Sequence, residues 1–343
     1  MTHKQWKISF VILTLILVFC QAGVAKPIKF KIATLSPDGS MWVKKMVEGA
    51  GQVAKKTQNR VSFKFYPSGR MGNDKMVLKK IKIGQLHGGA VVTGSLSQLF
   101  PANQIYAQPM KFKTLDEIDY VRKHMDDFII NGLEEKGFVT FGLIGGGFSY
   151  IMSKNPINTV QDLRQQKVWI PDNDTISKDA IKAFGINPIP LPIADVRISL
   201  QSGLINTVAT SPMGAIVLQW HTQIKYVTQM PLIYLHAVLA IDKKKFMKVA
   251  EADRQIVKQI MTRVSKEIQA QNRIDDEKNI AVLKKRGITF LSPPADAARE
   301  WKRIGKNASD KMIEAGVLPE NIAQELDMHL KTFHQSGRTA HAQ

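Results

Sequence analysis

The segment that decides the fold is residues 159–203, which read TVQDLRQQKVWIPDNDTISKDAIKAFGINPIPLPIADVRISLQSG. Residues 160–163 are expected to open a short helix, and the β-branched and aromatic residues of 167–171 indicate a strand. A second helix is expected to end at Gly185, and a Pro-rich passage leads into a third that ends at Gly203. Such close alternation of strands and helices is typical of α/β proteins with mainly parallel strands. The segment therefore predicts an α/β fold.

The same alternation continues on both sides of this segment. Residues 255–285 are rich in Glu, Lys, Gln and Ala and contain neither Pro nor Gly before Gly287, which predicts one long helix. Coiled-coil dimerisation is the alternative for such a helix, but its apolar positions fade after Ile274, and a monomer is expected. Strands are predicted at 28–33, 61–66, 88–93 and 138–144, and helices at 41–56, 73–83 and 114–136.

The N-terminus predicts export. Lys4 and Lys7 precede an apolar run over residues 8–20, and small residues follow at 23–25, which is typical of a signal peptide removed after residue 25. A membrane anchor is the alternative, but the run is shorter than the ~20 apolar residues of a span. Lipidation at Cys20 is a second alternative, disfavoured by the large side chain that precedes it. The chain is therefore expected to be periplasmic.

Composition narrows the class of protein further. The single cysteine lies in the predicted signal peptide, so disulfides and cysteine-based sites are excluded from the mature chain. The chain carries 48 Lys and Arg against 29 Asp and Glu, a formal charge of +19. The lysines are scattered in short runs rather than gathered with aromatic residues, which argues against nucleic-acid binding. Peripheral contact with an anionic membrane surface, or binding of anionic solutes, stays open.

Catalytic motifs are absent from the sequence. It contains no G-x-S-x-G, no H-E-x-x-H, no P-loop and no G-x-G-x-x-G. Only His329 and His334 approach the spacing of metal ligands on a helix, and they lie near the C-terminus. An enzyme remains the rival class, because a cleft between two α/β lobes suits catalysis as well, but the sequence favours a protein that is not an enzyme, with no cofactor and no metal.

Several short motifs, taken in order, resemble one receptor family. They are YPSGRMG at 66–72, IGQL at 83–86, GFS at 147–149, GINPIPLP at 185–192, LQSG at 200–203 and Pro212. Their order and spacing are similar to the DctP-like solute receptors of tripartite ATP-independent periplasmic (TRAP) transporters. Two positions depart from the family pattern: His87 stands where the family has Asp, and Asn206 and Thr207 replace a frequent Asp-Gly pair.

The resemblance implies a two-lobed, periplasmic-binding-protein-like receptor with hinge strands and a long helix spanning both lobes. Lobe I is expected to comprise 26–150 and about 236–270, lobe II 151–235 and about 271–330, and 331–343 a disordered tail. Such a receptor captures a small organic solute between its lobes and delivers it to membrane subunits driven by an ion gradient. A receptor-like envelope protein without a transport role, such as a sensor, is the alternative.

Trp169 is the most informative departure from the family pattern. The resemblance places there an arginine that holds a solute carboxylate, with a second arginine common at the position of Ser149. An indole has one N–H donor and a large apolar face, so it cannot offer the paired donors of a guanidinium. Four interpretations of Trp169 stay open. An aromatic or apolar solute stacks on the indole, a cation binds on its face, a carboxylate is held by Lys167 or Arg197 instead, or the indole simply fills the cleft.

The remaining candidate ligand-binding residues come from the resemblance and from their places at strand ends. Phe148 and Tyr150 flank Ser149 and are expected to share the stacking. The others are Trp42, Thr93, Asn173, Asn206, Ser211 and Tyr234.

Overall fold

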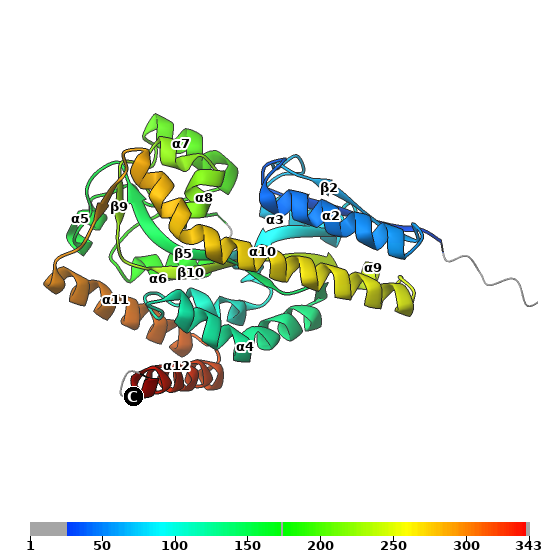
Figure 1. Cartoon of the computed structure of the whole chain (residues 1–343). Helices are drawn as coiled ribbons and strands as arrows, with labels where there is room; N and C mark the ends of the chain where they lie inside the picture. Colours follow the sequence, from blue (N-terminus) through cyan, green and yellow to red (C-terminus); the bar gives the residue numbers. More distant parts are fainter. Residues whose placement is uncertain (1–25, 173, 341–343) are drawn as a thin grey trace, which may run out of the picture.

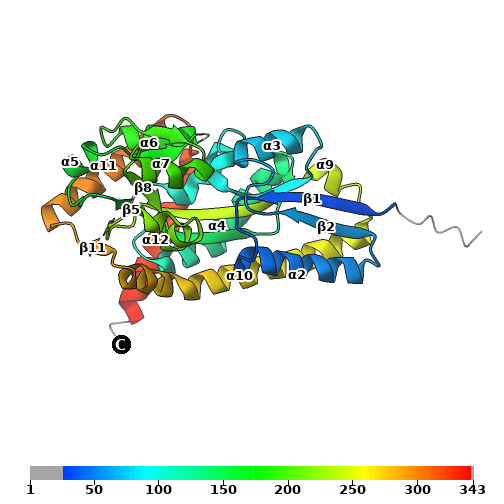
Figure 2. The same ribbon diagram turned by 90° about the horizontal axis from the view of Figure 1, so that it is seen from above.

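The computed structural model describes residues 26–172 and 174–340. The predicted signal peptide, residues 1–25, and the candidate Asn173 lie outside the described residues. Two α/β lobes lie side by side along one long helix, as Figures 1 and 2 show. The α/β class, the two lobes and the long helix predicted from the sequence are confirmed.

One sheet joins the two lobes. Within the described residues it holds nine strands in the order β11-β9-β5-β10-β3-β1-β2, with β4 beside β10 and β8 beside β5. Strands β5 and β10 are long, antiparallel neighbours that pass from one lobe to the other, which makes them the hinge strands. The strands are β1 (Ile28–Thr34), β2 (Val61–Tyr66), β3 (Gly88–Val92), β4 (Phe138–Val139), β5 (Leu143–Ser153), β8 (Thr207–Thr210), β9 (Tyr226–Thr228), β10 (Ile233–Asp242) and β11 (Thr289–Leu291).

Lobe I is built on the parallel strands β1, β2 and β3. Helix α2 (Met41–Lys56) begins at Ser40, whose hydroxyl accepts a hydrogen bond from the Val43 amide, a standard N-cap. Its apolar face packs against Phe30 and Ile32 of β1. The helix α3 (Asp74–Lys82) covers the other face. The predicted bounds of α2 and β2 agree with the structure, because both have a clean apolar period.

Lobe II is formed by shorter elements around β8 and β9. The strand predicted at 167–171 is only three residues long and pairs with β7 in a separate two-stranded sheet. Short strands suffice here because helices and the hinge strands supply the core. The elements are α5 (Val160–Arg164), β6 (Trp169–Pro171), α6 (Thr175–Lys182), β7 (Ile189–Leu191), η3 (Ile193–Asp195), α7 (Val196–Ser202), α8 (Pro212–Val217) and η4 (Trp220–Thr222).

The long helix is α10 (Glu251–Lys285), which contacts α2 in lobe I and α8 in lobe II. It starts four residues earlier than predicted, after the short α9 (Lys243–Phe246). The strand predicted at 138–144 is instead two strands, and β5 runs on to Ser153. Gly142 between them has a φ of +118°, a conformation that breaks a strand and favours glycine.

A layer of helices covers the face of the sheet opposite to α2. Helix α4 (Leu115–Glu135) begins with a capping box of Thr114 and Glu117. Residues 93–96 and 101–107 form the short helices η1 (Thr93–Leu96) and η2 (Pro101–Ala107). Helix α11 (Ala295–Glu314) packs on α6 and α5. None of the helices in the described ranges is long and apolar enough to cross a membrane.

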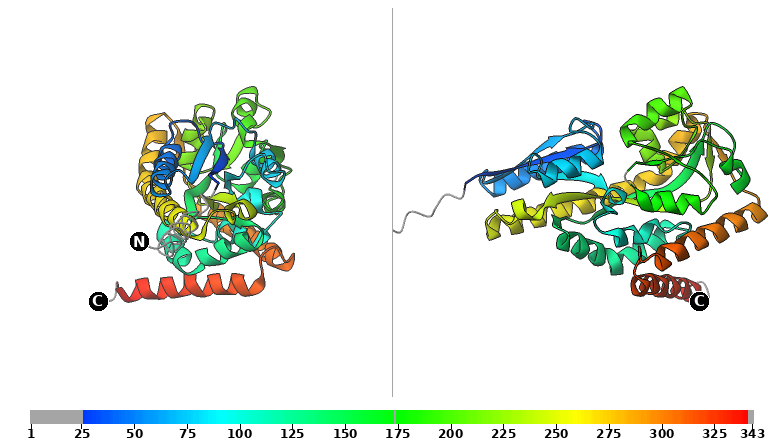
Figure 3. Two further views of the ribbon diagram at one scale, coloured as in Figure 1. Left: turned by 90° about the vertical axis from the view of Figure 1, so that its right-hand side faces the viewer. Right: turned by 180° about the vertical axis from the view of Figure 1, so that it is seen from behind.

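The C-terminal segment differs from the predicted disordered tail. Helix α12 (Glu320–Ala340) continues through most of it and packs on α4, as seen beneath the molecule in Figures 1 and 3. The ring centroids of Phe333 and Tyr120 lie 5.5 Å apart, and His334 Nε2 forms a hydrogen bond with Glu117 Oε1 at 2.7 Å. These contacts fix the helix against the rest of the protein, up to the residues that they involve. Residues 341–343 lie outside the described residues, and the predicted lobe bounds stay a prediction.

Candidate functional site

A cavity of about 310 Å³ lies between the lobes, over the hinge strand β10. Lobe I contributes the end of β3 and the start of η1, and lobe II contributes β6, α6, the end of β8 and the start of α8. Ligands of open α/β sheets collect at such carboxyl ends of strands. The cavity is therefore the candidate solute site.

Trp169 lies on the lobe II wall of this cavity. Its side chain is buried, and its Nε1–H donates a hydrogen bond to the Leu191 carbonyl at 2.9 Å. Its ring meets Trp220 edge to face, with centroids 5.1 Å apart and an interplanar angle of 78°. The parallel pairing of Trp169 with Ile189 orients the indole toward Leu191. Because the indole N–H is already bonded to Leu191, the Trp169 side chain offers the cavity an apolar ring and no hydrogen-bond donor.

The polar groups on the cavity wall are few and largely bonded within the protein. Thr93 Oγ1 donates to the His236 carbonyl at 3.0 Å, and Ser211 Oγ accepts from the Gly214 amide at 3.1 Å as the N-cap of α8. Asp174 accepts from the Ser177 amide at 3.0 Å and its hydroxyl at 2.6 Å. Among the described residues that line the cavity, Asp174 is the one carboxylate and there is no Lys or Arg.

Four of the predicted ligand-binding residues come together in this cavity: Trp169, Thr93, Ser211 and Tyr234. They belong to four separate elements or their ends, so their convergence depends on the packing of the two lobes. The sequence contained a partial sign of this site, because Thr93 and Trp169 lie within the strands predicted at 88–93 and 167–171. Ser211 and Tyr234 were candidates only through the family resemblance.

The other candidates are not among the residues that line the cavity. Phe148 packs in the core of lobe I, its ring 5.8 Å from that of Tyr234. Ser149 pairs with Ile233 inside the sheet and is fully buried. Tyr150 packs between two core clusters, and burial together with the nearby Asp276 raises its pKa to about 12.

Asn206 and Trp42 have structural roles. Asn206 Oδ1 accepts from the Lys167 amide at 2.9 Å, and its Nδ2 donates to Gln166, which fixes the turn before β8. Trp42 packs edge to face on Phe65 at 6.3 Å, between α2 and β2. Both residues are thus engaged in local structure rather than at the cavity wall.

The two basic residues that were considered as possible carboxylate partners, Lys167 and Arg197, are engaged elsewhere. Lys167 Nζ donates to the Gly203 carbonyl at 3.1 Å, and Arg197 Nη1 donates to Gln219 at 2.9 Å. Neither lines the cavity. The lining therefore offers no support for a carboxylate held by Lys167 or Arg197.

His236 and a polar network beneath it were not anticipated from the sequence. His236 is buried against the ring of Tyr106, at 5.4 Å. Burial and the positive charge of Arg122 lower the pKa of His236 to about 3, so the imidazole is neutral. Arg122 bonds Asp126 and reaches the Tyr234 hydroxyl at 3.3 Å. The ion pair with Asp126 offsets the buried charge of Arg122. The contact between Arg122 and Tyr234 joins residues far apart in the chain, and no sequence motif predicts it.

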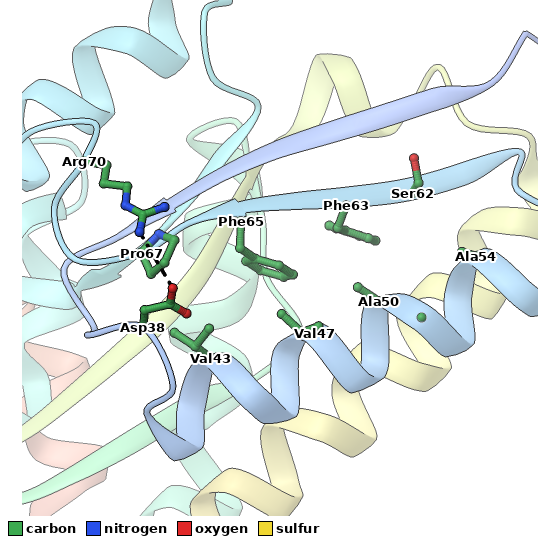
Figure 4. A pocket seen from close by; sticks show the side chains of 11 residues that line it. Asp38, Val43, Val47, Ala50, Ala54, Ser62, Phe63, Phe65, Pro67 and Arg70 are labelled. Atoms are coloured by element: carbon green, nitrogen blue, oxygen red, sulfur yellow. Dashed lines mark ion pairs between the residues drawn. The ribbon is translucent and has the colours of Figure 1, made fainter.

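A second hollow, of about 430 Å³, lies between α2 and the edge strand β2. Figure 4 shows Val43, Val47 and Ala50 of the helix facing Phe63 and Phe65 of the strand. An Asp38–Arg70 ion pair of 3.7 Å closes one end. All of its lining comes from lobe I, so the movement of one lobe against the other does not enclose it. No group of three His, Cys, Asp or Glu in the described part of the chain is arranged to hold a metal.

Comparison with known proteins gives one consistent result. Residues 32–315 match the family model "Bacterial extracellular solute-binding protein, family 7". The chain is 24% identical to the uncharacterized protein YiiZ of Salmonella typhimurium over 56% of its own length and 61% of that protein. A solute-binding protein of Chromohalobacter salexigens is 24% identical over 64% of this chain and 66% of its own. The chain thus spans somewhat under two thirds of these two relatives.

Longer matches exist at lower identity. The sialic acid-binding periplasmic protein SiaP of Vibrio cholerae is 20% identical over 90% of this chain and 97% of its own. A TRAP periplasmic solute-binding protein from Pseudomonas putida with bound D-glucuronate superposes with a TM-score of 0.80, at 18% identity, covering 88% and 97% of the two chains. A Bordetella pertussis extracytoplasmic solute receptor binding pyroglutamic acid also has a TM-score of 0.80, at 17% identity, covering 89% and 99%.

Proposed function

Because the chain belongs to the bacterial extracellular solute-binding protein family 7, we propose that it is a periplasmic receptor for a TRAP transporter. It captures a small organic solute in the cavity between its lobes and delivers it to membrane subunits driven by an ion gradient. Its family consists of solute-binding receptors rather than enzymes.

The solute is aromatic or apolar and is not a carboxylate held by an arginine. The observation that carries this proposal is the cavity wall, where the rings of Trp169 and Trp220 stand and the described lining holds no Lys or Arg. A buried carboxylate needs a cationic or multiply donating partner to offset its desolvation. Relatives of the same fold were crystallised with D-glucuronate and pyroglutamic acid, both acids.

Capture follows from closure of the lobes. Because the cavity takes its walls from both lobes, a solute touching both stabilises the closed arrangement by its differential affinity. We place the bending at the glycines of β5, where Gly147 has a φ of +83° and the pairing with β10 shifts register between Leu235 and His236. Glycine and a bulge let strands bend without breaking the sheet.

The test is a thermal-shift screen of the mature chain against neutral aromatic, apolar, amine and carboxylate solutes. A solute at 100 times its dissociation constant adds ~2.7 kcal/mol to stability. We expect neutral aromatic or apolar solutes to stabilise the wild type, Trp169→Phe to retain much of the effect, and Trp169→Arg to lose it. Stabilisation of the wild type by succinate or D-glucuronate, with no response to neutral solutes, would contradict the ligand class.

Solution scattering then tests closure separately from ligand class. Saturation with a stabilising solute should reduce the radius of gyration of the wild type. An unchanged profile at saturation would remove lobe closure from the mechanism while leaving the ligand class standing.

A further inference from the structure

Positive charge is concentrated in the first third of the mature chain. Residues 26–115 contain 16 Lys and Arg and only three acidic residues, Asp38, Glu48 and Asp74. None of these cations lines the interlobe cavity, so the solute site does not account for them. The fold decides whether they are dispersed or gathered on one surface.

Strands β1 and β2 gather three of these lysines on one face. The parallel register places Lys31 opposite Lys64 and Lys29 opposite Ser62. Since alternate residues of a strand point to opposite faces, and Phe30 and Ile32 enter the core, the lysines point outward. All three are exposed, and none forms an ion pair with another described residue. Like charges directly opposite each other on one face of a sheet are destabilising, and an anionic partner would offset that repulsion.

The region after β10 adds further lysines at the same end of lobe I. Lys26, Lys245 and Lys248 rim a hollow of about 500 Å³ beside the first residues of β1. Lys245 and Lys31 both lie near His87. Burial lowers the pKa of His87, and the positive charges of these two lysines lower it further. Figures 1 and 2 show α9 and the start of β1 at one end of the molecule, away from α5 to α8.

The acidic residues of this region are already engaged. Asp253 forms two hydrogen bonds with Arg60, at 2.8 and 2.9 Å. Asp242 accepts from the Lys245 amide at 2.7 Å as the N-cap of α9. The charge of Asp253 is thus offset by Arg60, and Asp242 is a single carboxylate beside several lysines. The surface formed by Lys26, Lys29, Lys31, Lys64, Lys245 and Lys248, here named the basic tip, therefore has an excess of positive charge.

We propose that the basic tip docks the receptor on the surface of an anionic phospholipid bilayer. A bilayer fits better than a compact anion, because the charges are lysine ammonium groups spread over a surface rather than a fork of guanidinium donors. Met247, 52% exposed between Lys244 and Lys248, adds an apolar contact of the kind that enters a headgroup region.

Docking by this end leaves the solute site accessible. The cavity lies beyond the carboxyl end of β3, which runs parallel to β1 and pairs with it from Ile32 onward. Lys29 and Lys31 precede that pairing, so they lie toward the opposite end of lobe I. A receptor held by the basic tip keeps its lobes free to close while it moves along the membrane toward a partner.

Co-sedimentation of the mature chain with vesicles tests the proposal. We expect binding to vesicles containing phosphatidylglycerol, little binding to pure phosphatidylcholine, and loss of binding as salt rises from about 0.1 M to about 1 M. Each lysine near an anionic surface strengthens binding about fivefold. The triple variant Lys29→Gln, Lys31→Gln and Lys64→Gln should therefore bind about 100-fold more weakly.

A matched variant separates the basic tip from overall charge. Lys225→Gln, Lys285→Gln and Lys302→Gln remove the same charge from exposed, unpaired lysines of the described part of lobe II, and should reduce binding far less than the basic-tip variant. An equal loss in both variants, or equal binding to both kinds of vesicle, would overturn the proposal. So would full competition by millimolar inorganic phosphate, which indicates an anion site, or binding of a polyglutamate peptide but not of vesicles, which indicates a protein partner.

Discussion

Asp74 gives a prediction whose sign and size follow directly from its surroundings. Its carboxylate lies at the start of α3 and is 5% exposed. It accepts hydrogen bonds from Ser95 Oγ at 2.8 Å and the Val92 amide at 3.3 Å. Burial raises its pKa from 3.8 to about 6, although the two bonds oppose the shift and the nearby Asp172 adds to it.

The raised pKa means that the folded chain holds this proton more tightly than the unfolded chain. Between pH 3.8 and about 6 the unfolded state has already released the proton, so stability falls as pH rises through that window. The whole shift corresponds to about 3 kcal/mol at 1.36 kcal/mol for each unit of pKa. Of this, about 1.4 kcal/mol is lost between pH 5 and pH 8.

Replacing Asp74 with asparagine keeps an acceptor oxygen and removes the titration. We therefore expect the free energy of unfolding of Asp74→Asn, relative to the wild type, to increase by about 1.4 kcal/mol from pH 5 to pH 8. Urea denaturation followed by circular dichroism at the two pH values measures this difference, and any constant cost of the amide cancels.

Asp38→Asn provides the matched control. Asp38 is exposed and pairs with Arg70 at 3.7 Å, so its loss should have a small effect. The reasoning would be refuted if the difference in unfolding free energy between Asp74→Asn and the wild type were the same at both pH values or changed in the opposite direction. The cost of burying the ionised Asp74 would then not explain the pH dependence of stability.

Three further predictions concern the packing around the site. His236→Leu should remove an acid sensitivity, since a pKa lowered to about 3 costs the wild type about 2 kcal/mol of stability as pH falls from 8 to 5. Urea denaturation at the two pH values should show a larger loss of stability for the wild type than for the variant, and an equal loss would refute the reasoning. Gly132→Ala should destabilise α4 by about 1–3 kcal/mol, because its new Cβ would lie 2.3 Å from the Phe100 ring. The control Gly51→Ala, with no atom within 4 Å, should stabilise α2 by about 0.5–1 kcal/mol, and a similar fall in melting temperature for both would contradict the clash. Trp169→Ala should cost about 3–5 kcal/mol, and a loss below about 1 kcal/mol would show that the indole is not part of the lobe II core.

Much of the fold could be predicted from the sequence because local patterns and long-range packing agree. The amphipathic period of 41–56 and the alternation of 61–66 predict α2 and β2 with the bounds that the structure has. The break in the strand predicted at 138–144 was missed, because the apolar pattern continues through Gly142 and does not reveal its φ of +118°.

The site shows the same division. A place at a predicted strand end selected Thr93, and the family resemblance selected Trp169, Ser211 and Tyr234; all four line the cavity. Ser149, by contrast, came from the same resemblance but is fully buried within β5, where it pairs with Ile233, and it does not line the cavity.

The sequence by itself determined the α/β class and the long helix, because composition and periodicity are properties of the chain. Only the tertiary structure decided that the Trp169 N–H is used by Leu191, that Lys167 and Arg197 are engaged away from the cavity, and that Lys31 stands opposite Lys64. Those facts depend on strand register and on contacts between residues distant in the chain. Burial and neighbouring charge, which set the affinity of a site for its ligand, arise only when these contacts form.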